Sequence, residues 1–293
     1  MTQIALPIAL GIIMFGVGLS ITLGDFARVV RRPKAVFIAL SCQIVLLPLV
    51  SFDLVIAFHL PPMLAVGMML LAAAPGGTTA KLFSHLFRGD VALNISLAVV
   101  NAVITVVTLP LITNIAIAYF VLGRLSLSLN VVEMVKILAI VLLPAALGML
   151  VRRFRPRSAD AMGAPVRILS IAILVVVIAA SVVSNLDVLV ANFVALAAIT
   201  TLFCFASLNL GYWSARLLRV ERSQVIASAF EVGIHNATLA IVIAQSMLGS
   251  VEISLPAAVY AIVIYVVAAG FGLAVRRWGT RVNARSVAKY VRS

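Results

Sequence analysis

Lys81 and Glu231 are charged residues within long apolar stretches of this 293-residue chain. Each stands beside residues that interrupt a helix: residues 74–78 (Ala-Pro-Gly-Gly-Thr) precede the lysine, and residues 232–236 (Val-Gly-Ile-His-Asn) follow the glutamate. A charged side chain at the centre of a bilayer costs roughly 3 kcal/mol on insertion scales, so it faces a protein interior or a watery cavity. Two interrupted helices with such charges, one in each half of the chain, predict a secondary transporter.

The composition places the whole chain in lipid. Hydrophobic residues make up 64% of it and charged residues 11%, and the mean hydropathy is +1.22. No soluble domain buries so much apolar surface, so we expect an all-α integral membrane protein in contact with the lipid bilayer. In this interpretation residues 1–275 form one transmembrane transporter domain, and residues 276–293 form a basic cytoplasmic tail.

Apolar runs predict about nine membrane-spanning helices. They lie near residues 4–22, 35–58, 61–86, 92–121, 132–151, 165–185, 190–215, 224–248 and 255–275. Most of the 22 Lys and Arg fall between these runs, at 24–34, 88, 152–167, 216–222 and beyond 275. Under the positive-inside rule these segments are cytoplasmic, so the N-terminus lies outside and the C-terminus inside. The net charge of +13 therefore reflects membrane topology, and we expect no nucleic-acid partner.

Proline and glycine interrupt the third of these runs. Proline has no amide donor and glycine loses much conformational freedom in a helix, so Pro75, Gly76 and Gly77 predict two short helices around an unwound middle. Backbone without helical hydrogen bonds is tolerated at this depth only where it lines a cavity. The second short helix begins near Thr78 and Thr79 and presents its positive end to that cavity, which favours an anion.

The 224–248 run repeats this pattern in the second half of the chain. A glutamate, a glycine and two further polar residues interrupt its apolar sequence: Glu231, Gly233, His235 and Asn236. These residues predict a second break that faces the same solute or ion pathway. The sequence alone leaves open whether the two interrupted runs belong to an inverted repeat.

One face of the 92–121 helix is polar or small. Residues spaced by 4, 3, 4 and 3 positions share that face: Asn94, Ala98, Asn101, Thr105 and Thr108. The rest of the helix is mainly Val, Ile and Leu, so we expect Asn94 and Asn101 to look inward and line the pathway. Hydrogen bonding between helices by Ser, Thr and Asn is the alternative role for this face.

Four stretches, in this order and spacing, resemble the bile acid:sodium symporter family. They are residues 11–19 with Asp25 and Phe26 following, residues 75–78, residues 88–93 and residues 231–236. The resemblance covers nearly the whole chain. It implies an inverted-repeat transporter fold of a core and a panel, with two discontinuous helices that cross near mid-membrane. It also implies a bacterial-type member in the inner membrane.

The sodium sites that the resemblance implies are altered in this chain. The family's first site uses a Ser-Asn pair, Ser and Thr on the next helix, and the glutamate; here Ala80 and Lys81 replace the pair, and Asn94 and Ala98 replace the next two. The second site uses two glutamines and the glutamate, of which Gln43 and Glu231 remain while His235 replaces the other glutamine. Hard cations prefer oxygen to a neutral imidazole. The resemblance thus leaves one weakened Na⁺ site at Gln43, Glu231 and His235.

We therefore hypothesise that Lys81 substitutes for the first sodium by pairing with Glu231. At an effective dielectric of about 20, such a contact gains roughly 4 kcal/mol before desolvation is counted. Coupling would then run on H⁺, on one Na⁺, or on no ion. Two alternatives stay open: a purely structural ion pair, and a Lys81 that holds the substrate's carboxylate or sulfate.

The function that these residues predict is secondary active transport of an organic anion by alternating access. The resemblance implies a bile-acid-like compound, a steroid sulfate or a small carboxylate as substrate. A membrane sensor that binds a ligand without transport and an efflux carrier of related fold are the alternatives. An intramembrane hydrolase is disfavoured because the sequence has no His-Glu-x-x-His motif and Asp53 has no second intramembrane aspartate, so we expect no enzymatic activity.

Overall fold

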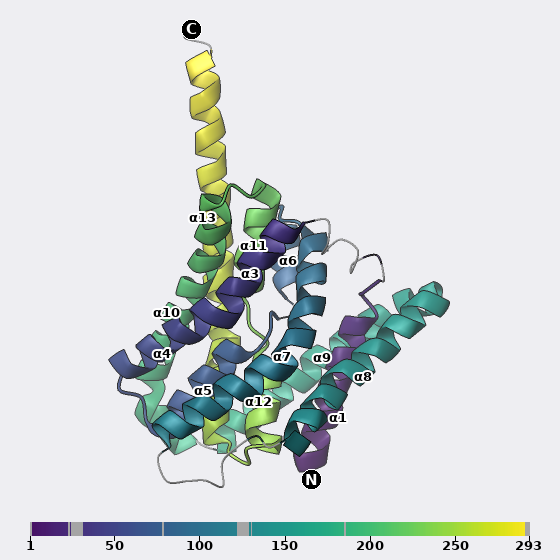
Figure 1. The fold of residues 1–293 in the computed structure, drawn as a ribbon, viewed down its shortest axis with the longest axis vertical. Coiled ribbons are helices and arrows are strands. Elements are labelled where there is room, and N and C mark those ends of the chain that lie inside the picture. The colour runs from purple at the N-terminus through teal and green to yellow at the C-terminus, as the bar shows by residue number, and fades with distance from the viewer. Residues whose placement is uncertain are drawn as a thin grey trace.

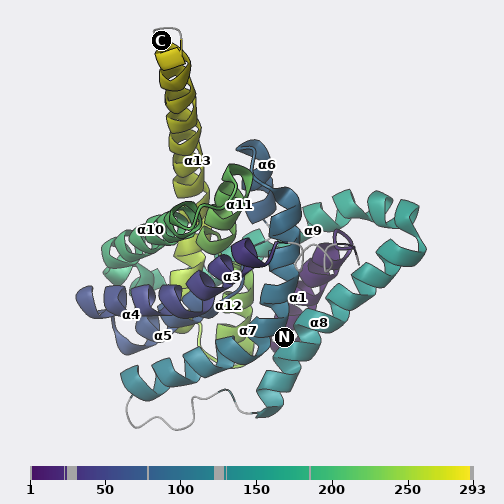
Figure 2. The same cartoon turned by 45° about the horizontal axis from the view of Figure 1, so that its top comes forward.

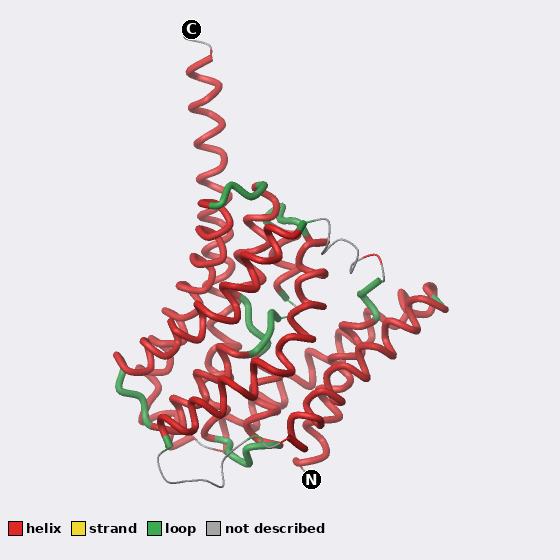
Figure 3. Tube along the Cα trace, in the orientation of Figure 1, coloured by secondary structure: helices red, strands yellow, loops and turns green. Residues whose placement is uncertain are grey.

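The computed structural model describes residues 2–22, 24, 32–77, 79–121, 129, 131–184 and 186–290. Within these residues the regular structure is helical, with no strand (Figure 3). Four helical segments are long and apolar enough to cross a membrane: Pro33–Ala57, Val91–Phe120, Leu186–Leu217 and Glu252–Arg277. The described part of the chain is thus that of an all-α integral membrane protein, as its composition predicts.

The helices follow the predicted apolar runs closely. In chain order they are α1 (Thr2–Gly18), α3 (Pro33–Ser41), the π-helical η1 (Cys42–Leu46), α4 (Leu47–Ala57), α5 (Pro62–Ala73), α6 (Ala80–Leu86), α7 (Val91–Phe120), α8 (Val131–Phe154), α9 (Pro156–Ser184), α10 (Leu186–Leu217), α11 (Arg222–Gly233), α12 (Ala237–Ser246), the 3₁₀ turn η2 (Glu252–Ser254) and α13 (Leu255–Tyr290). α9 starts well before the predicted residue 165, because Pro156 suits a first helical turn. α13 continues beyond the predicted residue 275 into the basic segment (Figure 1).

Three helices, α1, α8 and α9, lie together along one side of the molecule (Figure 2). Two glycines let α1 and α8 approach closely: a Cβ on Gly18 would overlap the Ala145 backbone, and one on Gly148 would overlap the backbone near Phe15. Small residues at such contacts are typical of helix packing in membranes. We call these three helices the α1–α8–α9 group and the helices α3–α7 and α10–α13 the main body.

The main body contains two interrupted helices. α5 ends at Ala73, Ala74 has an extended backbone before Pro75, and α6 begins only at Ala80. α11 ends at Gly233, Ile234 is extended, and α12 begins at Ala237. The two connecting loops meet in the middle of the helical bundle (Figure 3).

Candidate functional site

The two helix breaks cross and bond to each other. Gly76 and His235 form an antiparallel bridge, with Gly77 N–H donating to the Ile234 carbonyl over 2.6 Å and Asn236 N–H donating to the Pro75 carbonyl over 2.9 Å. Backbone polar groups within a membrane must find partners inside the protein. Each break therefore supplies hydrogen bonds that the other has lost, and their relative position is fixed.

Glu231 lies in the last turn of α11, directly before the second break. Its side chain is 2% exposed, and Asn94 Nδ2 on α7 donates to its Oε2 over 2.9 Å. The same Asn94 Nδ2 also donates to the Ala227 carbonyl over 3.0 Å. A Cβ on Gly76 would collide with the Glu231 carboxylate, so only a glycine lets the first break approach it. The carboxylate is thus held between α7 and the first break.

His235 is enclosed by residues of α10, η1, α13 and the first break. Its ring stacks on Phe203 of α10 at a centroid distance of 5.0 Å, and its Nδ1 lies 3.3 Å from Gln43 Nε2. Gln43 sits in the π-helical turn η1, and its Nε2 donates to the Ala74 carbonyl over 2.9 Å. π-Turns within helices occur frequently at functional sites.

Tyr260 of α13 bonds to the backbone at the end of α11 and lies next to the histidine ring, at a centroid distance of 5.7 Å. Its hydroxyl donates to the Gly233 carbonyl over 2.7 Å and accepts from the His235 N–H over 3.2 Å. These are backbone groups that an uninterrupted helix would satisfy itself. Tyr260 therefore stabilises the extended conformation of the second break.

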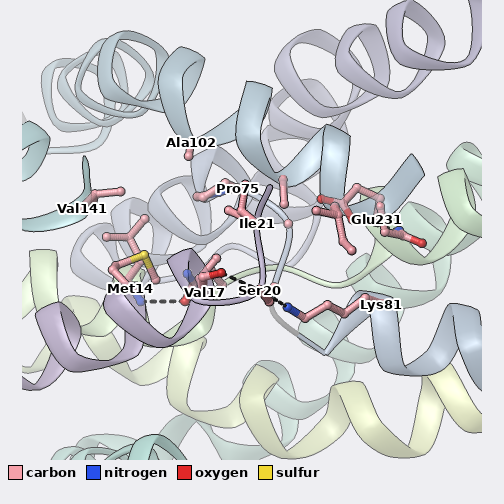
Figure 4. A pocket seen from close by; sticks show the side chains of 16 residues that line it. Met14, Val17, Ser20, Ile21, Pro75, Lys81, Ala102, Val141 and Glu231 are labelled. Carbon is pink, nitrogen blue, oxygen red and sulfur yellow. Dashed lines mark hydrogen bonds between the residues drawn. The ribbon is translucent and has the colours of Figure 1, made fainter. Parts of the chain in front are cut away.

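Lys81 lies in the first turn of α6 and reaches toward α1. Its Nζ donates to Ser20 Oγ over 2.8 Å, and Figure 4 shows the side chain directed at that hydroxyl. The pairing of Lys81 with Glu231 stays a prediction. Lysine has a long, flexible side chain, so charge attraction alone does not decide which neighbour it contacts. Glu231 and Lys81 nevertheless line the same cavity.

Two cavities adjoin the crossing. The smaller measures about 60 Å³ and lies between the breaks, α7 and the α1–α8–α9 group; its polar lining comes from Ser20, Lys81, Asn94, Glu231 and Asn236 (Figure 4). The larger measures about 710 Å³ and lies between that group and α6, α12 and α13. Ser20, Lys81 and Asn236 line both, so they stand where the two cavities meet.

Several buried polar atoms near the crossing have no hydrogen-bond partner among the described residues: Gln43 Oε1, Asn94 Oδ1, Glu231 Oε1 and His235 Nε2. Three of them are oxygens, the ligand type that hard cations prefer. Within the described residues no group of three or more His, Cys, Asp or Glu side chains could hold a metal ion. Side-chain oxygens of this kind could ligate a cation.

The other predicted site residues occupy different places. Thr79 precedes α6 and lines the larger cavity, and Asn236 caps α12 by accepting from the Leu239 N–H over 3.1 Å. Asn101 is buried on the same face of α7 as Asn94, but it is not among the lining residues of either cavity. Thr78 lies outside the described residues.

Three residues that contact Lys81 or His235 were not predicted from the sequence, namely Ser20, Phe203 and Tyr260. A weak signal existed for Tyr260, because a tyrosine hydroxyl within an apolar span needs a hydrogen-bond partner. Ser20 stands at the end of an apolar run with no pattern around it, and Phe203 is one of the 14 phenylalanines. Neither could be singled out before the helices were placed.

A profile of the Sodium Bile acid symporter family matches residues 7–192, which is more than half of the chain. The chain belongs to this family. An uncharacterized sodium-dependent transporter of Bacillus subtilis, YocS, is 30% identical to it over 258 residues, which are 88% of this chain and 78% of that protein. This similarity agrees with the family that the four sequence motifs indicate.

Two further relatives are more distant. The human ileal sodium/bile acid cotransporter is 27% identical over 82% of this chain and 68% of that protein. A probable chloroplastic sodium/metabolite cotransporter of Arabidopsis thaliana is 24% identical over 86% of this chain and 62% of that protein. The family and these relatives are transporters and not enzymes, so the chain is a membrane transporter.

Proposed function

We propose that this family member carries an organic anion across a bacterial inner membrane by secondary active transport. The observation that carries the proposal is the meeting of Lys81 and Glu231 at one cavity, where two helix breaks cross. Interrupted helices near mid-membrane are where secondary transporters bind substrates and coupling ions. A bile-acid-like compound, a steroid sulfate or a small carboxylate would be the substrate.

Alternating access would come from movement of the α1–α8–α9 group, as the panel, against the main body, as the core. Both cavities lie between these two parts, so a shift of one against the other changes their access. About nine spans, an N-terminus outside and a cytoplasmic C-terminus complete the proposed topology.

The proposed coupling ion is a single Na⁺. Gln43 Oε1 and Glu231 Oε1 lack partners in the described residues and would serve as its ligands. A second Na⁺ is disfavoured because Lys81 brings a fixed positive charge into the smaller cavity and Ala80 supplies no oxygen there. Lys81 thus stands in for one sodium by its charge.

Uptake by proteoliposomes tests this function. Labelled taurocholate, cholate and pantoate would be offered while Na⁺ and pH gradients are imposed separately. We expect uptake of at least one anion to depend on sodium with a Hill coefficient of about 1, since one site remains. A coefficient near 2 would contradict the single sodium, uptake driven by pH alone would indicate proton coupling, and no uptake would contradict anion transport.

A further inference from the structure

The hydrogen bond between Lys81 and Ser20 joins the two parts of the molecule. Lys81 belongs to α6 of the main body, and Ser20 follows the end of α1 in the other group. Ser20 Oγ also donates to the Val17 carbonyl over 2.7 Å, so the hydroxyl is oriented by its own helix end. The Lys81 ammonium therefore ties α6 to α1 in this conformation.

This bond lies at the edge of the larger cavity. Thr79, Lys81, Asn236 and Thr238 supply a polar end there, while α1 and α13 supply apolar walls that include Val17 and Ile264. The volume of about 710 Å³ falls within the range of sites for drug-sized ligands, which is roughly 300–1,000 Å³. A cavity with one polar end and apolar walls fits an amphipathic ligand that has one polar end.

The charges around the cavity favour an anionic polar end. Arg152 and Asp160 also line the cavity, but they form an ion pair with each other, so their charges largely offset. In this state the Lys81 ammonium donates a hydrogen bond to a neutral hydroxyl, and the Glu231 carboxylate lines the smaller cavity with it. A hydrogen bond in which both partners are charged is stronger than one to a neutral acceptor. An anion in the cavity would therefore compete with Ser20 for Lys81.

We propose that the anionic group of the substrate takes the place of Ser20 on Lys81 Nζ, so that the substrate itself releases α6 from α1. The substrate is then an amphipathic monoanion, a carboxylate or a sulfonate, whose apolar part lies along α1 and α13. Binding and the freedom of the two parts to move are thereby linked through one side chain. This proposal rests on the proposed function, and it deepens it by naming the group that recognises the anion.

Binding measurements on the purified protein in lipid nanodiscs test the exchange of partners. The probes are cholate, taurocholate and the neutral primary amide of cholate, which keeps the steroid body and lacks the charge. Ser20→Ala removes the competing acceptor and should tighten binding of the anions by about tenfold, because hydrogen bonds to charged groups contribute at about that level. Lys81→Gln should weaken the anions at least about tenfold and leave the amide unchanged, and Lys81→Arg should retain anion binding.

A matched control separates this effect from the loss of a helix-end bond. Thr201 is exposed on α10, and its Oγ1 donates to the Ala197 carbonyl over 2.6 Å, as Ser20 does to Val17. Thr201→Ala should therefore leave all three affinities unchanged. Anion binding that is unchanged or weaker in Ser20→Ala would overturn the proposal. Equal losses for cholate and its amide in Lys81→Gln, or no binding of any anion to the unmodified protein, would overturn it as well.

Spin labels at Ile8 on α1 and Leu86 on α6 report the release directly, since both side chains are well exposed. Cholate should broaden or shift the distance distribution between them, and Lys81→Gln should show that shift without cholate. A distribution that cholate leaves unchanged would overturn the release step. Binding that depends on Lys81 in a protein that shows no uptake would overturn the proposed transport and leave the exchange of partners intact.

Discussion

Gly76 and His235 face each other in an antiparallel bridge, so the two interrupted helices are joined through their backbones where they cross. One residue comes from the first half of the chain and the other from the second. Neither break satisfies its backbone alone, because Pro75 and Gly77 bond to residues of the other break. The crossing is therefore a single structural unit, and a substitution in one break should alter the conformation of the other.

Substitution Gly76→Ala should disturb Glu231. A Cβ at Gly76 would come within 2.8 Å of the Glu231 carboxyl carbon and 3.1 Å of its main-chain oxygen, so the carboxylate must move. We expect a loss of about 1–3 kcal/mol in stability, typical of overpacking, and a fall of at least about tenfold in sodium-dependent uptake. Thermal unfolding in detergent and proteoliposome uptake measure the two effects.

The control for this substitution is Gly270→Ala. A Cβ at Gly270 in α13 meets nothing within 4 Å, so stability and uptake should be unchanged or slightly improved. Normal sodium dependence in Gly76→Ala would show that the carboxylate does not need its position beside the first break.

Tyr260→Phe should destabilise the second break. The change removes only the hydroxyl, so the buried His235 N–H loses its acceptor, and the Gly233 carbonyl keeps only the weak donor Cys204 Sγ at 3.9 Å. The expected cost is about 1–3 kcal/mol in the free energy of unfolding. Tyr119→Phe is the matched control, because Tyr119 is 55% exposed and packs by its ring against Phe52. Equal melting temperatures for the two variants would contradict a role of the Tyr260 hydroxyl.

The helix breaks could be predicted from sequence because their cause is local. Proline without an N–H and two glycines cannot continue a helix, and α5 ends at Ala73 just before them. The bonds between the breaks could not be predicted, since they join residues far apart in the chain and depend on how α5 and α11 pack. For the same reason the sequence left the relation of the two runs open.

The partner of Lys81 shows the same limit on sequence reasoning. Charge and depth favour Glu231 as its partner, and both residues do reach one cavity. The hydrogen bond of Lys81 to Ser20 was not predicted, because it depends on the end of α1 lying beside α6. No motif in the sequence encodes how close the α1–α8–α9 group approaches α6.

Asn94→Ala should weaken sodium binding. Asn94 Nδ2 donates to Glu231 Oε2, and its removal leaves a buried carboxylate oxygen without that donor. Without this donor the Glu231 carboxylate could rotate away from the proposed Na⁺ site that it shares with Gln43. We therefore expect the half-saturating Na⁺ concentration to rise about tenfold. Asn209→Ala is the control, because Asn209 is only partly buried and its amide donates within its own helix, to the Phe205 carbonyl at 2.8 Å. An unchanged sodium dependence in Asn94→Ala would argue against Glu231 as an ion ligand.

His235→Gln should strengthen sodium binding. Glutamine offers a carbonyl oxygen where the imidazole offers nitrogen, and hard cations prefer oxygen. The side chain would keep contact with Gln43, which lies 3.3 Å from the ring nitrogen. Loss of the stacking on Phe203 should cost some stability, so sodium affinity must be measured on protein that is shown to be folded. We expect a lower half-saturating Na⁺ concentration in this variant. A higher concentration would show that residue 235 is not a ligand of the cation.

The double change Ala80→Ser with Lys81→Asn should create a second sodium site. It removes the fixed ammonium from the smaller cavity and adds two oxygen-bearing side chains to the first turn of α6. Glu231, which lines that cavity, already has one oxygen without a partner in the described residues. We expect the Hill coefficient for Na⁺ to rise from about 1 toward 2, because a mobile cation then takes over the charge that Lys81 supplied. Lys81→Asn alone should give an intermediate result, since Ala80 still lacks an oxygen. If uptake by the double variant keeps a coefficient of 1 at normal expression, Lys81 does not occupy the place of an ion.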